Sequence, residues 1–321
     1  MRKVLNDRSN QIVWLLFVSL LWLAAGRAEA VLLRYDLKKG DTARYKEMSA
    51  AAMRMSTSMM GQDNTMSGQQ TYTVIYRETV TDVTPEGVIS LVRTLESGKS
   101  TAKMSGMEEE MTEDMPKTET FIKMTNQGKI LSARTSSPED QTDGDTSDVS
   151  GVGMGSFGLD TAAMEAVFSH FPLPEEDVKP NDTWTDEVRM PGMLGGTAAT
   201  VTFKSCLLAV DRFDDRDCAK IRTVFEIPLE MDPSEMMGDM LPQGTETDVM
   251  GEASGKIAGR IEWQFDYKRG CVVYAEGPVL ATFDSSFSLG ELEGQSLAMS
   301  TSMAMKANEK IWLIGEEEAP Q

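Results

Sequence analysis

Methionine is the residue type whose abundance and spacing could support chemistry in this sequence. It makes up 24 of 321 residues, and the segment Met-Ser-Thr-Ser-Met occurs twice, at 55–59 and 299–303. Thioethers are soft ligands for Cu(I), and flexible methionine side chains also line adaptable apolar grooves or fill irregular cores. The candidate ligand-lining residues in and near these segments are Met53, Met55, Met59, Met303 and Met305.

Other patterns that could do chemistry have the wrong context. The single histidine, His170, has no nucleophile or orienting carboxylate at a local spacing, so we expect it to be a half-buried structural residue. Residues 153–158 match G-x-G-x-x-G, but no strand precedes them and no parallel βαβ unit surrounds them. The acidic clusters at 108–110 and 143–145 fit no EF-hand loop. We therefore expect no catalytic residues, no cofactor and no carboxylate-built metal site.

The three cysteines, Cys206, Cys218 and Cys271, all lie in the second half of the chain. An oxidising compartment would allow one disulfide. Cys206 and Cys218 lie on opposite arms of one expected hairpin, about 20 Å or more apart, beyond disulfide reach. Cys218 and Cys271 each begin the outgoing strand of a hairpin, so a Cys218–Cys271 disulfide is expected if those hairpins lie side by side. Three buried free thiols are the alternative.

The charge and the first 30 residues indicate an exported protein. A net charge of −20 disfavours a phosphate backbone, so nucleic acid is excluded as a partner. Basic residues within 1–8 precede an apolar run over 12–25 and the pattern Ala28-Glu29-Ala30, which is typical of a signal peptide. The apolar run is shorter than the roughly 20 residues that span a bilayer. We expect cleavage before Val31, a periplasmic or extracellular location, and at most transient membrane contact.

Strand patterns dominate the chain after residue 31. Apolar residues alternate on both sides of turn sequences, which predicts four hairpins. Their turns are expected at 84–87, 126–128, 214–217 and 268–270. The methionine-rich stretch 48–60 also fits a helical period, so a helix there stays open.

The predicted fold is mainly β, with two related antiparallel β modules packed as one unit and one amphipathic helix and an acidic linker between them. The helix is expected over 161–171, where apolar residues recur at helical spacing. The modules appear related because Leu37-Lys38-Lys39-Gly40-Asp41-Thr42 resembles Val178-Lys179-Pro180-Asn181-Asp182-Thr183, each a turn that opens a strand. The expected boundaries are signal peptide 1–30, first module 31–135, linker 136–158, helix and turn 159–175, second module 176–315 and acidic tail 316–321.

Several of these features together resemble a known group of sequences. They are the signal peptide, the opening at 38–42, the passage from Pro172 to Trp184 and the hairpin at Asn126-Gln127-Gly128. This combination resembles uncharacterised bacterial exported β-rich proteins, a domain-of-unknown-function family. Where that family has glycine before Asp-Thr-Trp, this sequence has Asn181, which also tolerates a left-handed backbone. The resemblance implies no known activity.

The expected function is that of an exported, non-enzymatic binding or carrier protein for an apolar or lipid-like ligand in the cell envelope. One alternative is an envelope structural or interaction protein with a protein partner and no small ligand. A second is a Cu(I)-binding protein, which needs about three converging methionine sulfurs. An exposed methionine-rich surface would favour the carrier, and complete burial of those side chains would favour the interaction protein.

Overall fold

The computed structural model describes residues 30–59, 62–107, 109–136, 169–190, 199–231, 249–292 and 295–317, and nearly all of this backbone is β-strand. The strands are β1 (Thr42–Met59), β2 (Gln62–Val83), β3 (Val88–Met104), β4 (Met111–Asp114), β5 (Glu119–Thr125), β6 (Ile130–Ser136), β7 (Thr183–Met190), β8 (Ala199–Phe213), β9 (Arg216–Met231), β10 (Val249–Asp266), β11 (Cys271–Leu292) and β12 (Gln295–Glu317). None of the described segments is a helix long and apolar enough to cross a membrane.

The strands form one antiparallel sheet in the order β6-β5-β3-β2-β1-β12-β11-β10-β9-β8-β7, with β4 beside β3. Most strands pair with their neighbours in the chain, whereas β1 pairs with β12 along its whole length, from Thr42 opposite Glu317 to Met59 opposite Met299. The first and last strands therefore meet in the middle of the sheet, and β6 and β7 stand at the two ends of its strand order.

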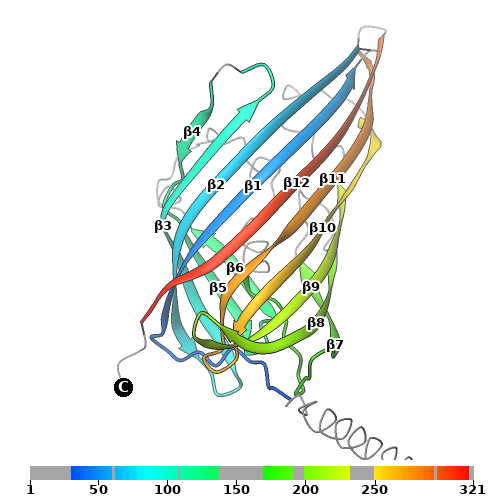
Figure 1. The fold of residues 1–321 in the computed structure, drawn as a ribbon. Coiled ribbons are helices and arrows are strands. Elements are labelled where there is room, and N and C mark those ends of the chain that lie inside the picture. Colours follow the sequence, from blue (N-terminus) through cyan, green and yellow to red (C-terminus); the bar gives the residue numbers. More distant parts are fainter. Residues whose placement is uncertain are drawn as a thin grey trace, which may run out of the picture.

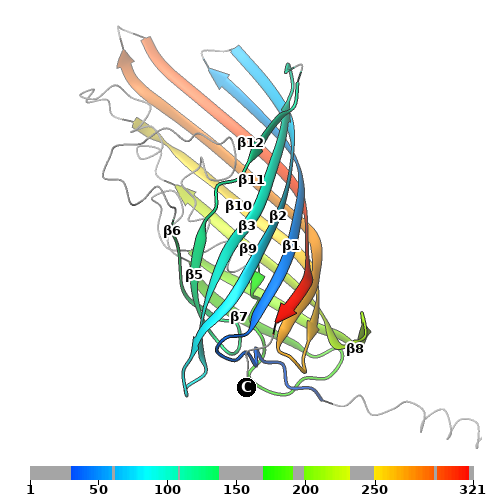
Figure 2. The same cartoon turned by 90° about the vertical axis from the view of Figure 1, so that its left-hand side faces the viewer.

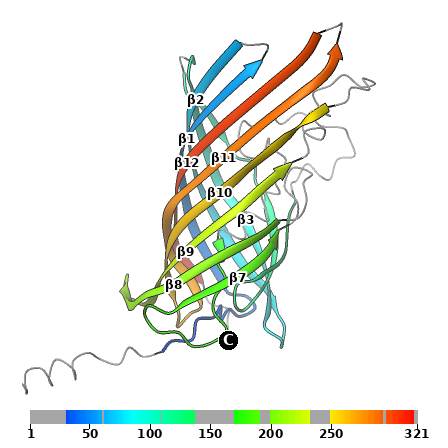
Figure 3. The same ribbon diagram turned by 90° about the vertical axis from the view of Figure 1, so that its right-hand side faces the viewer.

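The sheet is strongly curved (Figure 1). Turned views show that β1, β2, β11 and β12 extend past β7, β8 and β9 at one end of the molecule (Figures 2 and 3). Alternate residues of the long strands are buried, such as Tyr76 on β2 and Ile261 and Trp263 on β10. Because successive side chains of a strand point to opposite faces, this alternation gives the sheet an apolar inner face and a polar outer face.

Two segments without regular strands, residues 31–41 before β1 and residues 171–182 before β7, lie at the opposite end of the molecule (Figure 1). These two loops pair with each other through Val31 and Val178. The amide of Tyr35 donates to the carbonyl of Asn126 at 2.8 Å, and that of Leu173 donates to the carbonyl of Gln127 at 2.7 Å. Both loops are thus anchored on the β5–β6 turn, and their buried apolar side chains fill this end of the inner face.

The openings of β1 and β7 adopt the same turn, as the sequence predicts. The amide of Lys38 donates to the Asp41 carboxylate at 2.7 Å, and the amide of Lys179 donates to the Asp182 carboxylate at 2.8 Å. Gly40 and Asn181 occupy equivalent positions with φ of 94° and 76°. Asparagine is among the few non-glycine residues that accept this conformation, which explains the substitution.

The four predicted hairpins are confirmed. Positive φ values at Gly87, Gly128 and Gly270 allow three of the turns. In the fourth, Asp214 and Asp215 both have positive φ, and Phe213 pairs with Arg216, which is the pattern of a two-residue type I′ turn.

Other expectations about the fold are corrected or lie outside the described residues. The pair of modules is not confirmed, because β1 and β12 join their strands into a single sheet. Residues 48–59 are a strand, not a helix, and the expected acidic tail begins inside β12. The signal peptide, nearly all of the linker, and residues 161–168 of the expected helix lie outside the described residues, and Phe171 at its end lies in a loop.

Candidate ligand-binding site

A cavity with a volume of about 450 Å³ lies against the inner face of the sheet. This volume falls within the roughly 300–1,000 Å³ of small-molecule sites. Its lining comes mainly from β1, β2, β3, β10, β11 and β12. The aliphatic and methionine side chains of these strands that line it are Ala51, Val74, Leu95, Ile257, Ile261, Ala275, Val279, Met305, Ala307 and Ile311.

Aromatic side chains close the end of this cavity nearest the two loops. Trp263 lines the cavity, and Phe171 stacks on it with ring centroids 4.4 Å apart. Phe171 also meets Phe265 edge-on at 6.0 Å. The loop that carries Phe171 is fixed because the indole N–H of Trp184 donates to the carbonyl of Pro172 at 3.0 Å. The cavity therefore has a rigid aromatic floor.

A cluster of polar side chains, Glu47, Ser49, Tyr72 and Glu309, interrupts the apolar lining. The Tyr72 hydroxyl lies 2.8 Å from Oε1 of Glu47 and 3.0 Å from Oε2 of Glu309. Ser49 donates to Oε1 of Glu309 at 2.7 Å. The adjacent strands β2, β1 and β12 place these groups together, since Ser49 pairs with both Tyr72 and Glu309. All four residues line the cavity.

Burial governs the protonation of this polar cluster. Removal from water raises the pKa of Glu309, and the hydrogen bonds from Ser49 and Tyr72 only partly oppose that effect. Burial and the two neighbouring carboxyls raise the pKa of Tyr72 well above its usual value. Tyr72 is therefore a neutral phenol at physiological pH, and Glu309 holds its proton more readily than an exposed glutamate does.

A buried ion pair lies beside the cavity. Nε of Arg93 donates to Oε1 of Glu78 at 3.0 Å, and the guanidinium stacks on the ring of Tyr76 at 4.3 Å. Nε2 of His170 lies 3.5 Å from Oε2 of Glu78. Burial alone would raise the pKa of Glu78, but the charges of His170 and Arg93 outweigh it and lower this pKa to about 2. His170 is 5% exposed and has this structural contact, so it is more deeply buried than the sequence predicts.

Trp263 supplies a polar group of a different kind. Its side chain is 2% exposed, and its indole N–H has no hydrogen-bond partner among the described residues. Buried donors of this type nearly always have an acceptor. Trp263 lies in the same transverse row as Glu47, because Trp263 pairs with Ala275, Ala275 with Ile311, and Ile311 with Glu47.

The register between β1 and β12 brings four of the predicted methionines together. Met53 pairs with Met305, and Met55 pairs with Met303. Met55 also pairs with Met66 on β2, so a methionine band crosses three strands. The band comprises Met53, Met55, Met66, Met303 and Met305. These residues are in phase with Ala51 and Ala307, so they continue the cavity lining along the inner face; Met305 itself lines the cavity.

Met59 lies farther along the same strand. It pairs with Met299, which in turn pairs with Phe287 of β11. The Met59 side chain is 50% exposed, whereas the side chains of the methionine band are half-buried and so less exposed than Met59. The structure thus places Met59 beyond the band, toward the end of the molecule opposite the aromatic floor.

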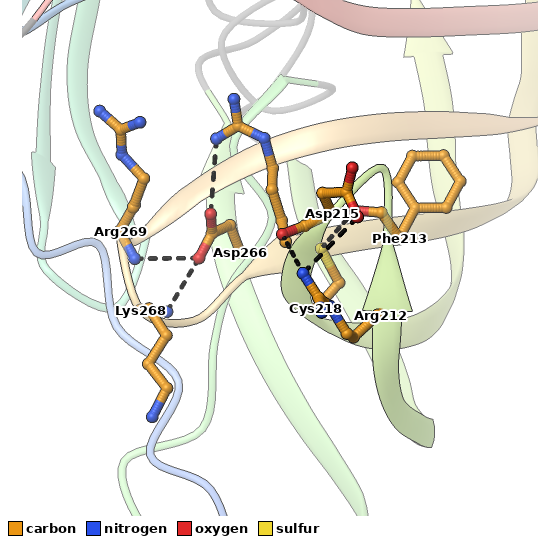
Figure 4. Close-up of polar contacts among 8 residues, drawn as sticks. Arg212, Phe213, Asp215, Cys218, Asp266, Lys268 and Arg269 are labelled. Atoms are coloured by element: carbon orange, nitrogen blue, oxygen red, sulfur yellow. Dashed lines mark hydrogen bonds and ion pairs between the residues drawn. The ribbon is translucent and has the colours of Figure 1, made fainter.

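The predicted Cys218–Cys271 disulfide is not present, and all three cysteines are free thiols. Cys218 and Cys271 both pair with Asp266, from opposite sides of β10. Two strand spacings amount to about 9.5 Å, which exceeds the Cα separation of a disulfide. Asp266 between them accepts hydrogen bonds from the amides of Lys268 and Arg269 at 3.0 and 3.1 Å, which fixes the β10–β11 turn (Figure 4).

The polar cluster and Trp263 are absent from the sequence-based set of site residues. A signal existed, because Glu47 and Glu309 occupy the apolar phase of their strands, between Tyr45 and Ser49 and between Ala307 and Ile311. Residues 153–158 and 143–145 lie outside the described part of the chain. Within that part, no group of histidine, cysteine, aspartate and glutamate side chains is arranged to hold a metal ion.

Comparisons with known proteins add little to this geometry. No family model and no curated protein matches the chain. One solved structure with some similarity is the outer membrane protein OprG from Pseudomonas aeruginosa, with 4% identity, coverage of 86% of this chain and 99% of that chain, and a TM-score of 0.18. Another is a DUF1329 family protein from Desulfovibrio piger, with 13% identity, coverage of 81% and 83%, and a TM-score of 0.13. At such TM-scores neither likeness carries an argument about fold or function.

Proposed function

We propose that this protein is an exported, non-enzymatic carrier that binds an apolar or lipid-like ligand in the cavity on the inner face of its sheet. The observation that carries the proposal is the cavity of about 450 Å³, apolar over most of its lining and closed at one end by Phe171 and Trp263. Burial of an alkyl chain in such a space contributes about 0.8 kcal/mol for each methylene group removed from water.

The methionine band supports a ligand in preference to a purely structural role. Met53, Met55, Met303 and Met305 are neither fully buried nor outward-facing, and they continue the cavity toward the open end of the sheet. Methionine side chains repack around ligands of different shape.

A cavity-filling substitution tests the proposal. Ala307→Phe places a ring in the cavity, whereas Ala304→Phe places the same ring on the exposed outer face of β12. We expect native mass spectrometry of the purified protein to show a bound mass of lipid size, or uptake of a long-chain lipid after delipidation. Ala307→Phe should lose this binding and Ala304→Phe should keep it. Equal binding by both variants, or none by the wild type, contradicts the proposal.

The row Met66, Met55 and Met303 favours Cu(I) binding as a second candidate function. Three thioethers on adjacent strands match the ligand type that Cu(I) prefers. Titration with Cu(I) against a competing chelator should then give a bound ion that Met55→Leu abolishes and that Met48→Leu, on the outer face, retains. Equal Cu(I) affinity in both variants excludes this site.

Export is part of the proposal and has its own test. The signal-like segment 1–30 directs the chain out of the cytoplasm and is cleaved before Val31. The mature protein recovered from the envelope or the medium should begin at Val31 on amino-terminal sequencing. A cytoplasmic protein that retains residues 1–30 contradicts this part.

A further inference from the structure

The polar side chains that line the cavity restrict which head group its ligand can have. Glu47 and Glu309 present carboxyl oxygens to a cavity whose lining is mostly apolar. A ligand head placed there must donate hydrogen bonds to these oxygens, and a negatively charged head would be repelled by them.

In the described lining of the cavity, no cation is available to offset this repulsion. Among the described residues that line the cavity, Arg93 is the one cation, and its guanidinium is already engaged by Glu78 and the ring of Tyr76. A carboxylate or phosphate head in the cavity would therefore have no charged partner, and desolvating it without one is strongly unfavourable.

Trp263 adds an independent requirement. Its buried indole N–H lacks an acceptor, and it can only donate. A ligand that reaches it must offer an oxygen acceptor. An ammonium group cannot do so, because it has no lone pair, whereas an ester carbonyl or a hydroxyl can.

We infer that the cavity selects neutral amphiphiles whose polar end carries both hydroxyl donors and an oxygen acceptor, as in a monoacylglycerol, and that it rejects fatty acids of the same chain length. The hydroxyl groups donate to Glu47 and Glu309, and the carbonyl accepts from Trp263. The acyl chain extends along the methionine band, so the ligand lies with its polar end toward the aromatic floor. This inference rests on the proposed function.

Three probes with the same oleyl or oleoyl chain separate head-group chemistry from chain burial: monoolein, oleate and oleylamine. Displacement of a fluorescent apolar reporter from the delipidated mature protein at neutral pH gives their relative affinities. We expect monoolein to bind at least about tenfold more tightly than oleate or oleylamine, because only its head satisfies both requirements.

Substitutions test whether the two carboxyl groups and the indole N–H of Trp263 cause the preference for monoolein. The double variant Glu47→Gln, Glu309→Gln should reduce the ratio of the affinity for monoolein to that for oleate. Trp263→Phe should lower the affinity for monoolein by about fivefold, as expected for one lost hydrogen bond. The matched controls are Glu187→Gln, which is exposed on β7, and Trp312→Phe, which lies outside the cavity lining. Both should leave the affinities unchanged. If Trp263→Phe fails to fold, the isosteric glutamine variants still test the preference.

The outcomes distinguish this inference from the proposed function. If oleate binds as tightly as monoolein, the head-group inference is wrong and the carrier proposal stands. Tighter binding of oleylamine than of monoolein also overturns the inference, because the carboxyls would then act as a receptor for positive charge. If none of the three probes binds, the carrier proposal itself fails.

Discussion

The phenolic oxygen of Tyr72 lies within hydrogen-bonding distance of two carboxyl groups, 2.8 Å from Glu47 and 3.0 Å from Glu309. A neutral phenol has one proton and can donate it fully to one carboxylate. The other carboxyl forms a good hydrogen bond to the phenol only when it carries a proton of its own. Below its raised pKa, Glu309 is the carboxyl that we expect to hold this proton, because burial makes its pKa higher than usual.

This arrangement predicts a pH dependence of stability that Glu309→Gln removes. A raised pKa means that the folded state binds the proton more tightly than the unfolded state, so stability falls as pH rises from the ordinary value of the glutamate through its raised value. At neutral pH we expect Glu309→Gln to be more stable than the wild type, by about 1 kcal/mol. Urea denaturation between about pH 4 and about pH 8 measures this difference. Glu187→Gln is the control, and parallel pH profiles for all three proteins would refute the assignment.

The buried ion pair predicts a large effect of Arg93→Met. Removal of the guanidinium leaves the Glu78 carboxylate buried without its arginine partner, which should cost about 3–5 kcal/mol. Arg77→Met is the control, because Arg77 pairs with Glu96 at 2.8 Å with 42% of its side chain exposed, and its loss should cost less than about 1 kcal/mol. Denaturant unfolding gives both values, and similar costs would contradict the burial argument.

The same pair predicts sensitivity to acid. The pKa of Glu78 is lowered to about 2, so its stabilising contribution is complete above the ordinary value of 4.5 and is lost as pH falls between these values. In Arg93→Met the loss should begin at higher pH, because the carboxylate has fewer partners. Acid titration followed by circular dichroism tests this shift, and coincident acid transitions would count against it.

Alanine substitutions at two glycines with positive φ distinguish the cost of backbone strain from the cost of a steric clash. Gly128 and Gly106 have φ of 78° and 92°. An added Cβ at Gly128 would lie 2.5 Å from the carbonyl oxygen of Phe171 and from Cε2 of Tyr35, whereas at Gly106 it would meet nothing within 4 Å. We expect Gly106→Ala to cost about 1 kcal/mol for the conformation alone, and Gly128→Ala to cost clearly more. Equal losses in thermal or denaturant unfolding would show that the loop carrying Phe171 moves aside freely.

The free cysteines predict a definite labelling order. Burial, together with the charge of Asp266, raises the pKa of Cys218 to about 11, so very little thiolate forms near neutral pH. Cys206 is half-buried and should react with a thiol reagent first. The protein is purified without reducing agent and alkylated briefly. Peptide mapping should then show that Cys206 is labelled and Cys218 is not. A Cys218–Cys271 cross-linked peptide would contradict the strand order.

Local features of the fold could be predicted from the sequence because short-range chemistry determines them. Turns with glycine, asparagine or aspartate at positive φ, such as Gly40, Asn181 and Asp214, were recognisable from residue type alone. The continuity of the sheet was not recognisable, since the pairing of β1 with β12 joins segments with no connecting turn. The disulfide prediction was wrong because the two hairpins are adjacent, but β10, the first strand of the second hairpin, lies between the strands that carry the two cysteines.

The site was only partly predictable. The methionine alternation identified an inner face, and the repeated segment contained a further clue. Met-Ser-Thr-Ser-Met reads the same in both directions, so antiparallel pairing of 55–59 with 299–303 sets each residue opposite its own kind, as Thr57 opposite Thr301. The cluster of Glu47, Tyr72 and Glu309 depends on register across three strands, which no local pattern specifies.

The pairing of β1 with β12 also determines when the molecule can be completed. Of the described strands, β1 is synthesised first and β12 last, so during synthesis one edge of β1 has no partner and the inner face lacks the strand that carries Met305 and Glu309. Closing a loop of this length is slow compared with forming hairpins. A nascent chain therefore stays open until its final strand is available, and an open chain is the form that can be threaded through a membrane before it folds.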